Sequence, residues 1–322
     1  MMKFSKQSIF TAACAVALTL SPMLASAAQL SSDGKTSIPK DVQQLIVVDY
    51  RAMQNSTAAM DLKDRMLPPE LKRLETAMKS SGLKVDQDAD VLAFAAFRAS
   101  GTGGDGTRIV GVAQGQFHTR EAMANFTKNK VKPVALRNHQ IYPMGSNGMS
   151  VVFLNQTTMV FGDKQAVTAA MDAYDGVGPN MLSNGDMVNE MASVDTKAIW
   201  SLLDAKGTQT MMKGVLGEAS QLADYDTVRN RMKSSRYTMD FQNGVKFNMT
   251  VNMSDTLTAA TCATLMKGVA ILRKTSGSPL EKSALDQTTI DSSGGVLSVD
   301  YSSSDSQFAS LLTSPLFQSV VK

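Results

Sequence analysis

Two histidines, His118 and His139, are the first candidates for catalysis, because imidazole changes its charge near neutral pH. A Ser–His–Asp hydrolase also needs a nucleophile on a sharp, exposed turn, which in one large fold class reads Gly-x-Ser-x-Gly. This motif does not occur in the chain. Metal binding needs several His, Cys or carboxylate ligands at short spacing, and neither histidine belongs to such a set. We therefore predict no catalytic and no metal-binding residue.

Two short motifs imitate ion-binding and phosphate-binding loops. The acidic residues 86–90 resemble the start of a calcium loop, but Val91 and Phe97 stand where that loop needs Gly and Glu. The glycine-rich residues 101–106 are followed by a strand pattern, and no Gly-Lys-Ser/Thr follows them. The first motif therefore predicts a solvated strand entry and the second a hairpin tip, and we expect no cofactor.

The densest basic cluster follows Asp224 and Asp226 closely. It favours a solvated helix face over a polyanion site, because acidic residues are near and few aromatic rings are available for stacking. The cluster consists of Arg229, Arg231, Lys233 and Arg236.

The sulfur-containing residues predict core packing. The chain has 22 methionines, many at helical or alternate-strand positions, where methionine usually fills the core. The pairs Met187/Met191 and Met249/Met253 are too dispersed for a thioether copper site. A pliable methionine-lined groove for an apolar ligand or a peptide is the alternative. Cys262 lies among small residues, which favours a buried structural cysteine over a reactive thiol.

The first residues predict export from the cytoplasm. Two lysines precede an apolar run over residues 9–20, and Ala25 and Ala27 occupy the −3 and −1 positions of a cleavage site. Residues 1–27 are therefore expected to be a signal peptide, and the mature protein to be periplasmic or secreted. A membrane anchor needs roughly 18–20 uninterrupted apolar residues, which this run lacks. A lipoprotein site at Cys14 lacks the usual apolar residue at −3.

The composition is that of a globular protein. Of 322 residues, 43% are hydrophobic and 19% charged, and the length suits one large domain or two of ordinary size. Loss of Lys3 and Lys6 with the signal peptide reduces the 32 basic residues to 30, against 29 acidic ones. A nearly neutral protein has no long-range attraction for polyanions, so we expect no nucleic-acid partner. No later segment is expected to span a bilayer.

Residues 148–176 show the pattern that organises the chain: strand, tight turn, strand, cap and helix. Asp163 is placed to accept hydrogen bonds from the first helical turn, and Gly176 is placed to end the helix. The pattern recurs. Residues 45–176 and 198–315 each read as strand, two helices, strand, hairpin, long strand, helix, hairpin and helix.

The clearest strand is Val245–Met253, where apolar and polar residues alternate. One buried and one wet face are typical of an antiparallel sheet with helices on a single side. The sequence therefore predicts an α+β fold of two similar units, each a mainly antiparallel sheet with helices packed on one face. We expect a disordered leader over residues 28–37, the first unit over 38–177 and the second over 178–322. A single irregular α+β domain is the alternative.

Two short motifs carry a resemblance to a known family. Pro39 and Asp41 stand before the strand at residues 45–48, and residues 160–164 open a helix that ends at residues 172–176. The chain resembles a family of secreted bacterial proteins of unknown function, with a Pro-x-Asp opening and repeated α+β units. The resemblance implies a periplasmic or cell-surface protein without catalysis, and it gives no catalytic residue to transfer.

These observations predict a non-catalytic secreted or periplasmic protein with a binding or scaffolding role, whose partner is an envelope protein or an apolar ligand. The first alternative is a carrier of a lipid or other apolar ligand between sheet and helices, which requires a large enclosed apolar cavity. The second is a hydrolase assembled from scattered residues, which requires a cleft where Asp, His and Ser side chains converge. Flat, well-packed sheets favour the binding or scaffolding role.

Overall fold

The computed structural model describes residues 29–66, 72, 76, 85–98, 106–144, 148–217 and 225–313. The expected signal peptide and most of the glycine-rich motif lie outside this part, apart from residue 106. So do most of residues 70–80, where the spacing of Leu71, Leu74 and Met78 predicts a helix. The described strands are β1 (Val42–Asp49), β2 (Ala89–Arg98), β3 (Thr107–Gly115), β4 (Val134–Leu136), β5 (His139–Met144), β6 (Met149–Phe153), β7 (Thr158–Asp163), β8 (Ile199–Leu203), β9 (Met232–Asp240), β10 (Val245–Met253), β11 (Thr288–Ser293) and β12 (Val296–Ser303).

The described helices connect these strands. They are α1 (Ser32–Thr36), α2 (Tyr50–Gln54), α3 (Thr57–Met66), α5 (Val85–Asp88), α6 (Thr119–Lys128), α7 (Lys164–Tyr174), the 3-10 turn η1 (Met181–Ser183), α8 (Gly185–Met191), α9 (Ala205–Leu216), α10 (Tyr225–Arg229), α11 (Thr256–Ser276), α12 (Pro279–Asp286) and α13 (Asp305–Leu312).

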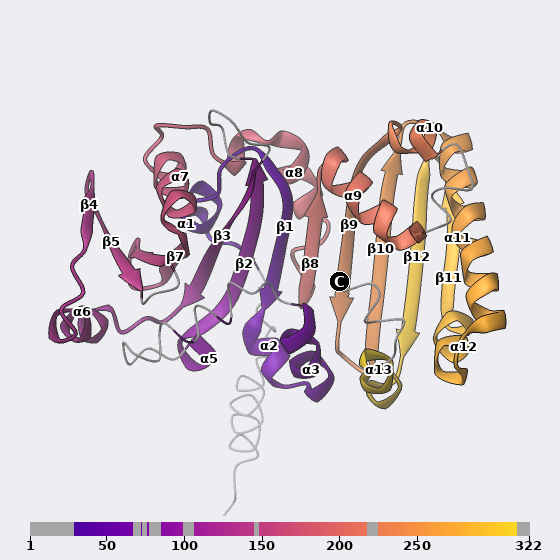
Figure 1. Cartoon of the computed structure of the whole chain (residues 1–322), viewed down its shortest axis with the longest axis horizontal. Coiled ribbons are helices and arrows are strands. Elements are labelled where there is room, and N and C mark those ends of the chain that lie inside the picture. The colour runs from indigo at the N-terminus through magenta and orange to yellow at the C-terminus, as the bar shows by residue number, and fades with distance from the viewer. Residues whose placement is uncertain are drawn as a thin grey trace, which may run out of the picture.

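The strands form one twelve-stranded sheet in the order β11-β12-β10-β9-β8-β1-β2-β3-β7-β6-β5-β4, and the described neighbours are antiparallel (Figure 1). The α+β class is confirmed. A separate sheet in each half is wrong, because β1 and β8 pair in the middle of the sheet, with Val47 opposite Trp200 and Val48 opposite Ile199. All four side chains are buried, so neither strand is suited to be a solvent-exposed edge.

The sheet has two faces with different helices. The first face contains Val47 and Trp200, and it packs in one apolar cluster with buried residues of α7, η1 and α8. The second face contains Val48 and Ile199, and in three clusters it packs against α6, against α2, α3 and α13, and against α9, α10 and α11. Side chains of directly opposite cross-strand partners lie on the same face of the sheet, so the strand register tells which face each side chain belongs to.

The expectation of helices on one face only is wrong for the N-terminal half. There α7 covers the first face and α6 the second, so β2 is buried on both sides. Its sequence shows why, because Ala89–Arg98 is a nearly continuous apolar run without alternation, as in strands covered twice. In the C-terminal half, η1 and α8 lie on the first face against β8, whereas α9, α10, α11 and α13 cover the second face, as expected from β10.

The halves share a strand order and differ in helix placement. Outward from the central pair the orders are β1-β2-β3-β7-β6 and β8-β9-β10-β12-β11, with the hairpin β4–β5 added to the first. However, α7 follows β7 onto the first face, whereas α13 follows β12 onto the second. The two halves therefore match in strand order but not in the placement of these helices, and their origin from one repeated unit stays a prediction.

Residues 28–37 were expected to be a disordered leader, and this expectation is wrong from residue 29 onward. Ser31 caps α1, and its backbone N–H donates to the Gln114 side chain at 2.9 Å. Leu30 is 4% exposed and Gly34 is buried, so the segment is held by apolar contacts with the first face. None of the helices in the described ranges combines the length and apolarity that crossing a bilayer requires.

Candidate binding face

The first face of the sheet loses its helical cover beyond β8. Side chains of β9, β10, β12 and β11 that lie on this side point away from the clusters formed with α9 and α11. We call them the open face. Three of its register rows are Asp240, Lys246 and Ser302; then Thr238, Asn248, Asp300 and Thr289; then Arg236, Thr250, Ser298 and Asp291.

The alternation of β10 produces this face. Met249, Val251 and Met253 point into the core with α11, so Lys246, Asn248 and Thr250 must point to the other side. The turn at Asn243 and Gly244, both at positive φ, fixes the register with β9. The chain therefore places a polar array on a rigid sheet.

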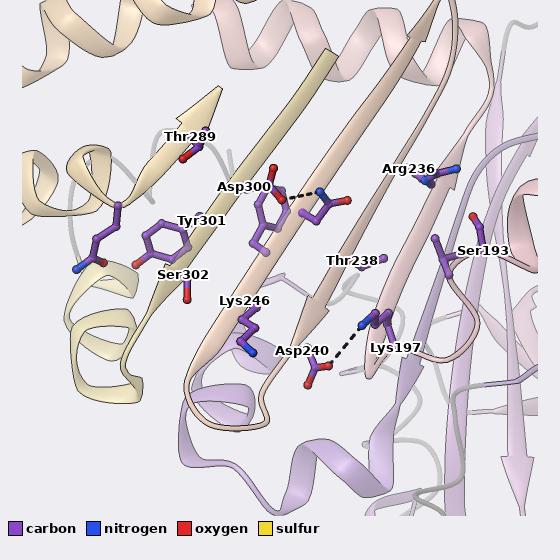
Figure 2. A pocket seen from close by; sticks show the side chains of 14 residues that line it. Ser193, Lys197, Arg236, Thr238, Asp240, Lys246, Thr289, Asp300, Tyr301 and Ser302 are labelled. Carbon is purple, nitrogen blue, oxygen red and sulfur yellow. Dashed lines mark hydrogen bonds and ion pairs between the residues drawn. The ribbon is translucent and has the colours of Figure 1, made fainter. Parts of the chain in front are cut away.

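Hydrogen bonds tie neighbouring side chains of the open face together. The Asn248 amide donates to the Asp300 carboxylate at 2.8 Å, and the Thr250 hydroxyl donates to the Asn248 carbonyl oxygen at 3.4 Å. The Lys197 ammonium lies 3.8 Å from the Asp240 carboxylate, which is a loose pair (Figure 2). These groups keep spare donors and acceptors for a polar partner.

Helix α8 forms a wall along one side of the open face. The Glu190 carboxylate accepts hydrogen bonds from Arg236 at 2.5 Å and from Asn252 at 3.0 Å. Met187 and Met191 of the same helix pack in the first-face core with Trp200. The helix layer thus ends in a step against the open strands.

A hollow of about 690 Å³ lies at the foot of this step, lined by Ser193, Lys197, Thr238, Lys246 and Asp300, among others (Figure 2). A smaller hollow of about 250 Å³ shares Lys197 and Asp240 and reaches Asp49. Burial raises the pKa of Asp49, although the carboxylate accepts a hydrogen bond from the Ala52 N–H at 2.7 Å. Asp49 caps α2, which is a structural role.

The two histidines are not brought together with a nucleophile. His139 lies 2.7 Å from the Asp175 carboxylate at the end of α7, and Arg137 binds the same carboxylate at 2.5 Å. His118 precedes α6 and lies 3.8 Å from Asp88. Among the described residues no serine hydroxyl is hydrogen-bonded to either imidazole.

The other candidates from the sequence are dispersed. Within the described ranges no three His, Cys, Asp or Glu side chains form a group that could hold a metal ion. Asp88 ends the short helix α5, and Asp90 is the second residue of β2 and pairs with Arg51. Cys262 is buried in α11, and burial raises the pKa of its thiol to about 11, which fits a structural residue.

The basic cluster was expected on a helix face, and this expectation is largely wrong. Arg229 ends α10, and the other members lie in or just before a strand. Residues 232–240 form β9, so Lys233 and Arg236 lie on a strand. Arg231 donates to the Asp255 carboxylate at 3.0 Å, and Arg236 binds Glu190. The pairs Met187/Met191 and Met249/Met253 belong to the core, as expected for methionine as filler.

Sequence reasoning found part of the open face and missed its border. The alternation of residues 245–253 identified the wet side of β10. The role of Glu190 could not be predicted from local sequence, because its hydrogen bonds to Arg236 and Asn252 join residues 46 and 62 positions apart. Cross-strand partners on β12 depend in the same way on a register that a single strand does not reveal.

No protein-family model and no curated protein matches the sequence. The fold is similar to that of TP0453, a protein of the bacterium Treponema. The chain matches crystal form I with a TM-score of 0.52 and 10% identity, covering 88% of this chain and 97% of that one. Crystal form III gives a TM-score of 0.50 and 8% identity, with 88% and 99% covered. At such identities the likeness concerns the fold alone.

Proposed function

We propose that this protein is a non-catalytic binding protein of the bacterial envelope and that the open face receives its partner. The observation that carries the proposal is the uneven cover of the sheet. Described helices pack on both faces of the sheet as far as β8 and on one face beyond it, where a step and a hollow of about 690 Å³ border four polar strands.

The chemistry of the open face supports a polar partner. Its side chains combine cations, carboxylates, amides and hydroxyls on a rigid support, and such groups provide orientation and specificity in an interface. The carrier and the hydrolase receive no comparable support, because this hollow is open and charged and the histidines lie outside it. The envelope location rests on the signal-peptide pattern of residues 1–27.

Cysteine labelling in cells tests this function. Ser302 is exposed on the open face, and Thr210 is exposed on α9, on the other side of the sheet. The variants Ser302→Cys and Thr210→Cys are labelled with a maleimide in intact envelopes and again after purification and dilution. Cys262 is buried and gives little background.

The expected result is protection at position 302 in the envelope, lost after dilution, with position 210 labelled equally in both states. Equal labelling of both positions in the envelope would show that the open face is unoccupied and would overturn the proposal.

A further inference from the structure

Charges are distributed unevenly across the open face. β10 contributes the cation Lys246, whereas β12 and β11 contribute the acids Asp300 and Asp291. The charges nearest α8 are already balanced, because Lys197 lies near Asp240 and Arg236 binds Glu190. A positive strand therefore lies beside two negative ones, and a partner should present the reverse order.

A second copy of the chain presents this reverse order. A two-fold axis parallel to the strands, between β10 and β12, lays β10 of each copy over β12 of the other, and β9 over β11. Lys246 then lies opposite Ser302 of the second copy, one register row from its Asp300. Asn248 and Asp300 exchange places across the axis, so a donor meets an acceptor.

The step at α8 fits the same arrangement. Stacked sheets lie about 10 Å apart, which matches the diameter of one helix layer. Each copy would therefore place its edge strand β11 beside the wall formed by α8 of the other. That contact also covers the outer edge of β11, which pairs only with β12 among the described strands.

The area sets the expected strength. Four strands about 4.8 Å apart and about eight residues long give roughly 500 Å² on each copy, or about 1,000 Å² in total. This value lies at the lower limit for a specific interface. A polar contact of this size should be concentration-dependent and weakened by salt.

We propose that the partner of the open face is a second copy of this chain, packed face to face about this two-fold axis. This inference rests on the proposed function of the open face and names its partner.

Analytical ultracentrifugation of the full mature chain, at about 1–200 µM and at low and high salt, tests the proposal. We expect a reversible dimer with a dissociation constant in the micromolar range. Lys246→Glu places like charges near Asp300 of the other copy, and Asp300→Lys does so near Lys246. Each should raise the dissociation constant at least about tenfold.

The double variant Lys246→Glu/Asp300→Lys restores opposite charges and should return the dissociation constant to within about threefold of the original value. The matched control is Lys213→Glu on α9, which is exposed on the other side of the sheet and should have no effect. Circular dichroism confirms that each variant is folded.

A monomer at all concentrations would overturn the second copy as partner, while protection of Ser302→Cys in envelopes would still support a binding role. A dimer that ignores both single variants, or a double variant that stays monomeric, would also overturn this arrangement. If the open face had no binding role at all, the cysteine at position 302 would be fully labelled in cells, which is a separate result from the association measurement.

Discussion

Met249 and Asn248 are adjacent in β10 and have opposite surroundings. Met249 is 4% exposed and lies in the core with residues of α9 and α11. Asn248 lies on the open face, where its amide binds Asp300. A charge introduced at the first position loses its hydration, whereas a charge on the open face keeps contact with water.

Met249→Asp should therefore lower the free energy of unfolding by about 3 kcal/mol or more. The control is Thr238→Asp on the open face, between the cation Arg236 and the acid Asp240 along β9, with an expected loss of about 1 kcal/mol or less. Asn248→Asp is a poor control, because it would place a second carboxylate beside Asp300. Urea denaturation measures both variants, and similar losses would contradict a one-sided burial of β10.

Helix starts show how far local sequence determines an element. Asp163 was predicted to cap α7, and its carboxylate accepts a hydrogen bond from the Ala166 N–H at 2.8 Å. From the sequence, Thr208 is also placed to cap a helix through Met212 and Leu216, but Asp204 caps α9, accepting a 2.7 Å bond from the Gly207 N–H. Thr208 is buried and bonds Ser235 of β9 at 2.8 Å. A hydroxyl near a helix start suits both roles, and only tertiary packing decides between them.

Asp163→Ala removes the cap of α7 and should cost about 1 kcal/mol of stability. Asp163→Asn keeps an oxygen that can accept the Ala166 N–H and should cost only a few tenths of a kcal/mol. Thermal denaturation of both variants is the measurement. A loss with Asn as large as with Ala would assign the effect to the ion pair with Arg108 rather than to the cap.

The hairpin β4–β5 is held to α7 by charged groups. Burial raises the pKa of Asp175, but hydrogen bonds and charges from His139 and Arg137 outweigh it, so the pKa of this carboxyl lies below its usual value. A depressed pKa in the folded state stabilises the protein above the unfolded pKa of about 3.9. This contribution is lost as the pH falls through the lower folded value.

Asp175→Asn should therefore lower the melting temperature most at about pH 6, and the difference from the parent protein should shrink towards about pH 3. The matched control is Asp186→Asn, at an exposed position in the first turn of α8. It removes an exposed carboxylate for which the structure shows no bond to His139 or Arg137. If the difference in melting temperature between Asp175→Asn and the parent protein were the same at every pH, the Asp175 carboxylate would not be a source of pH-dependent stability.

At the scale of the whole molecule, the sequence predicted the strands better than their assembly. Periodicity identified residues 245–253 as a half-buried strand, which the structure shows as β10. The pairing of β1 with β8 was not predictable, because it joins segments about 150 residues apart and both are apolar on both faces. The open face follows from that pairing, since the helix layer on the first face ends with α8 over β8.

The central pairing also determines how the molecule should unfold. Trp200 is the single tryptophan of the chain, and it is fully buried opposite Val47 where the two halves meet. The same core contains Val110 of the N-terminal half and Leu202 of the C-terminal half. Neither half can therefore unfold without exposing apolar surface of the other, which favours a single cooperative transition.

We expect urea unfolding followed by Trp200 fluorescence to coincide with unfolding followed by far-ultraviolet circular dichroism, with equal midpoints and slopes. Fluorescence reports the junction, whereas circular dichroism reports helices and strands throughout the chain. Two independent units would instead give two dichroism steps, with the tryptophan signal following one of them. Measurements at about 0.1 µM, below the expected micromolar dissociation constant, keep association from coupling the halves. A step in the circular dichroism signal without a change in Trp200 fluorescence would show that part of the sheet unfolds on its own, and would contradict the prediction of a single cooperative transition.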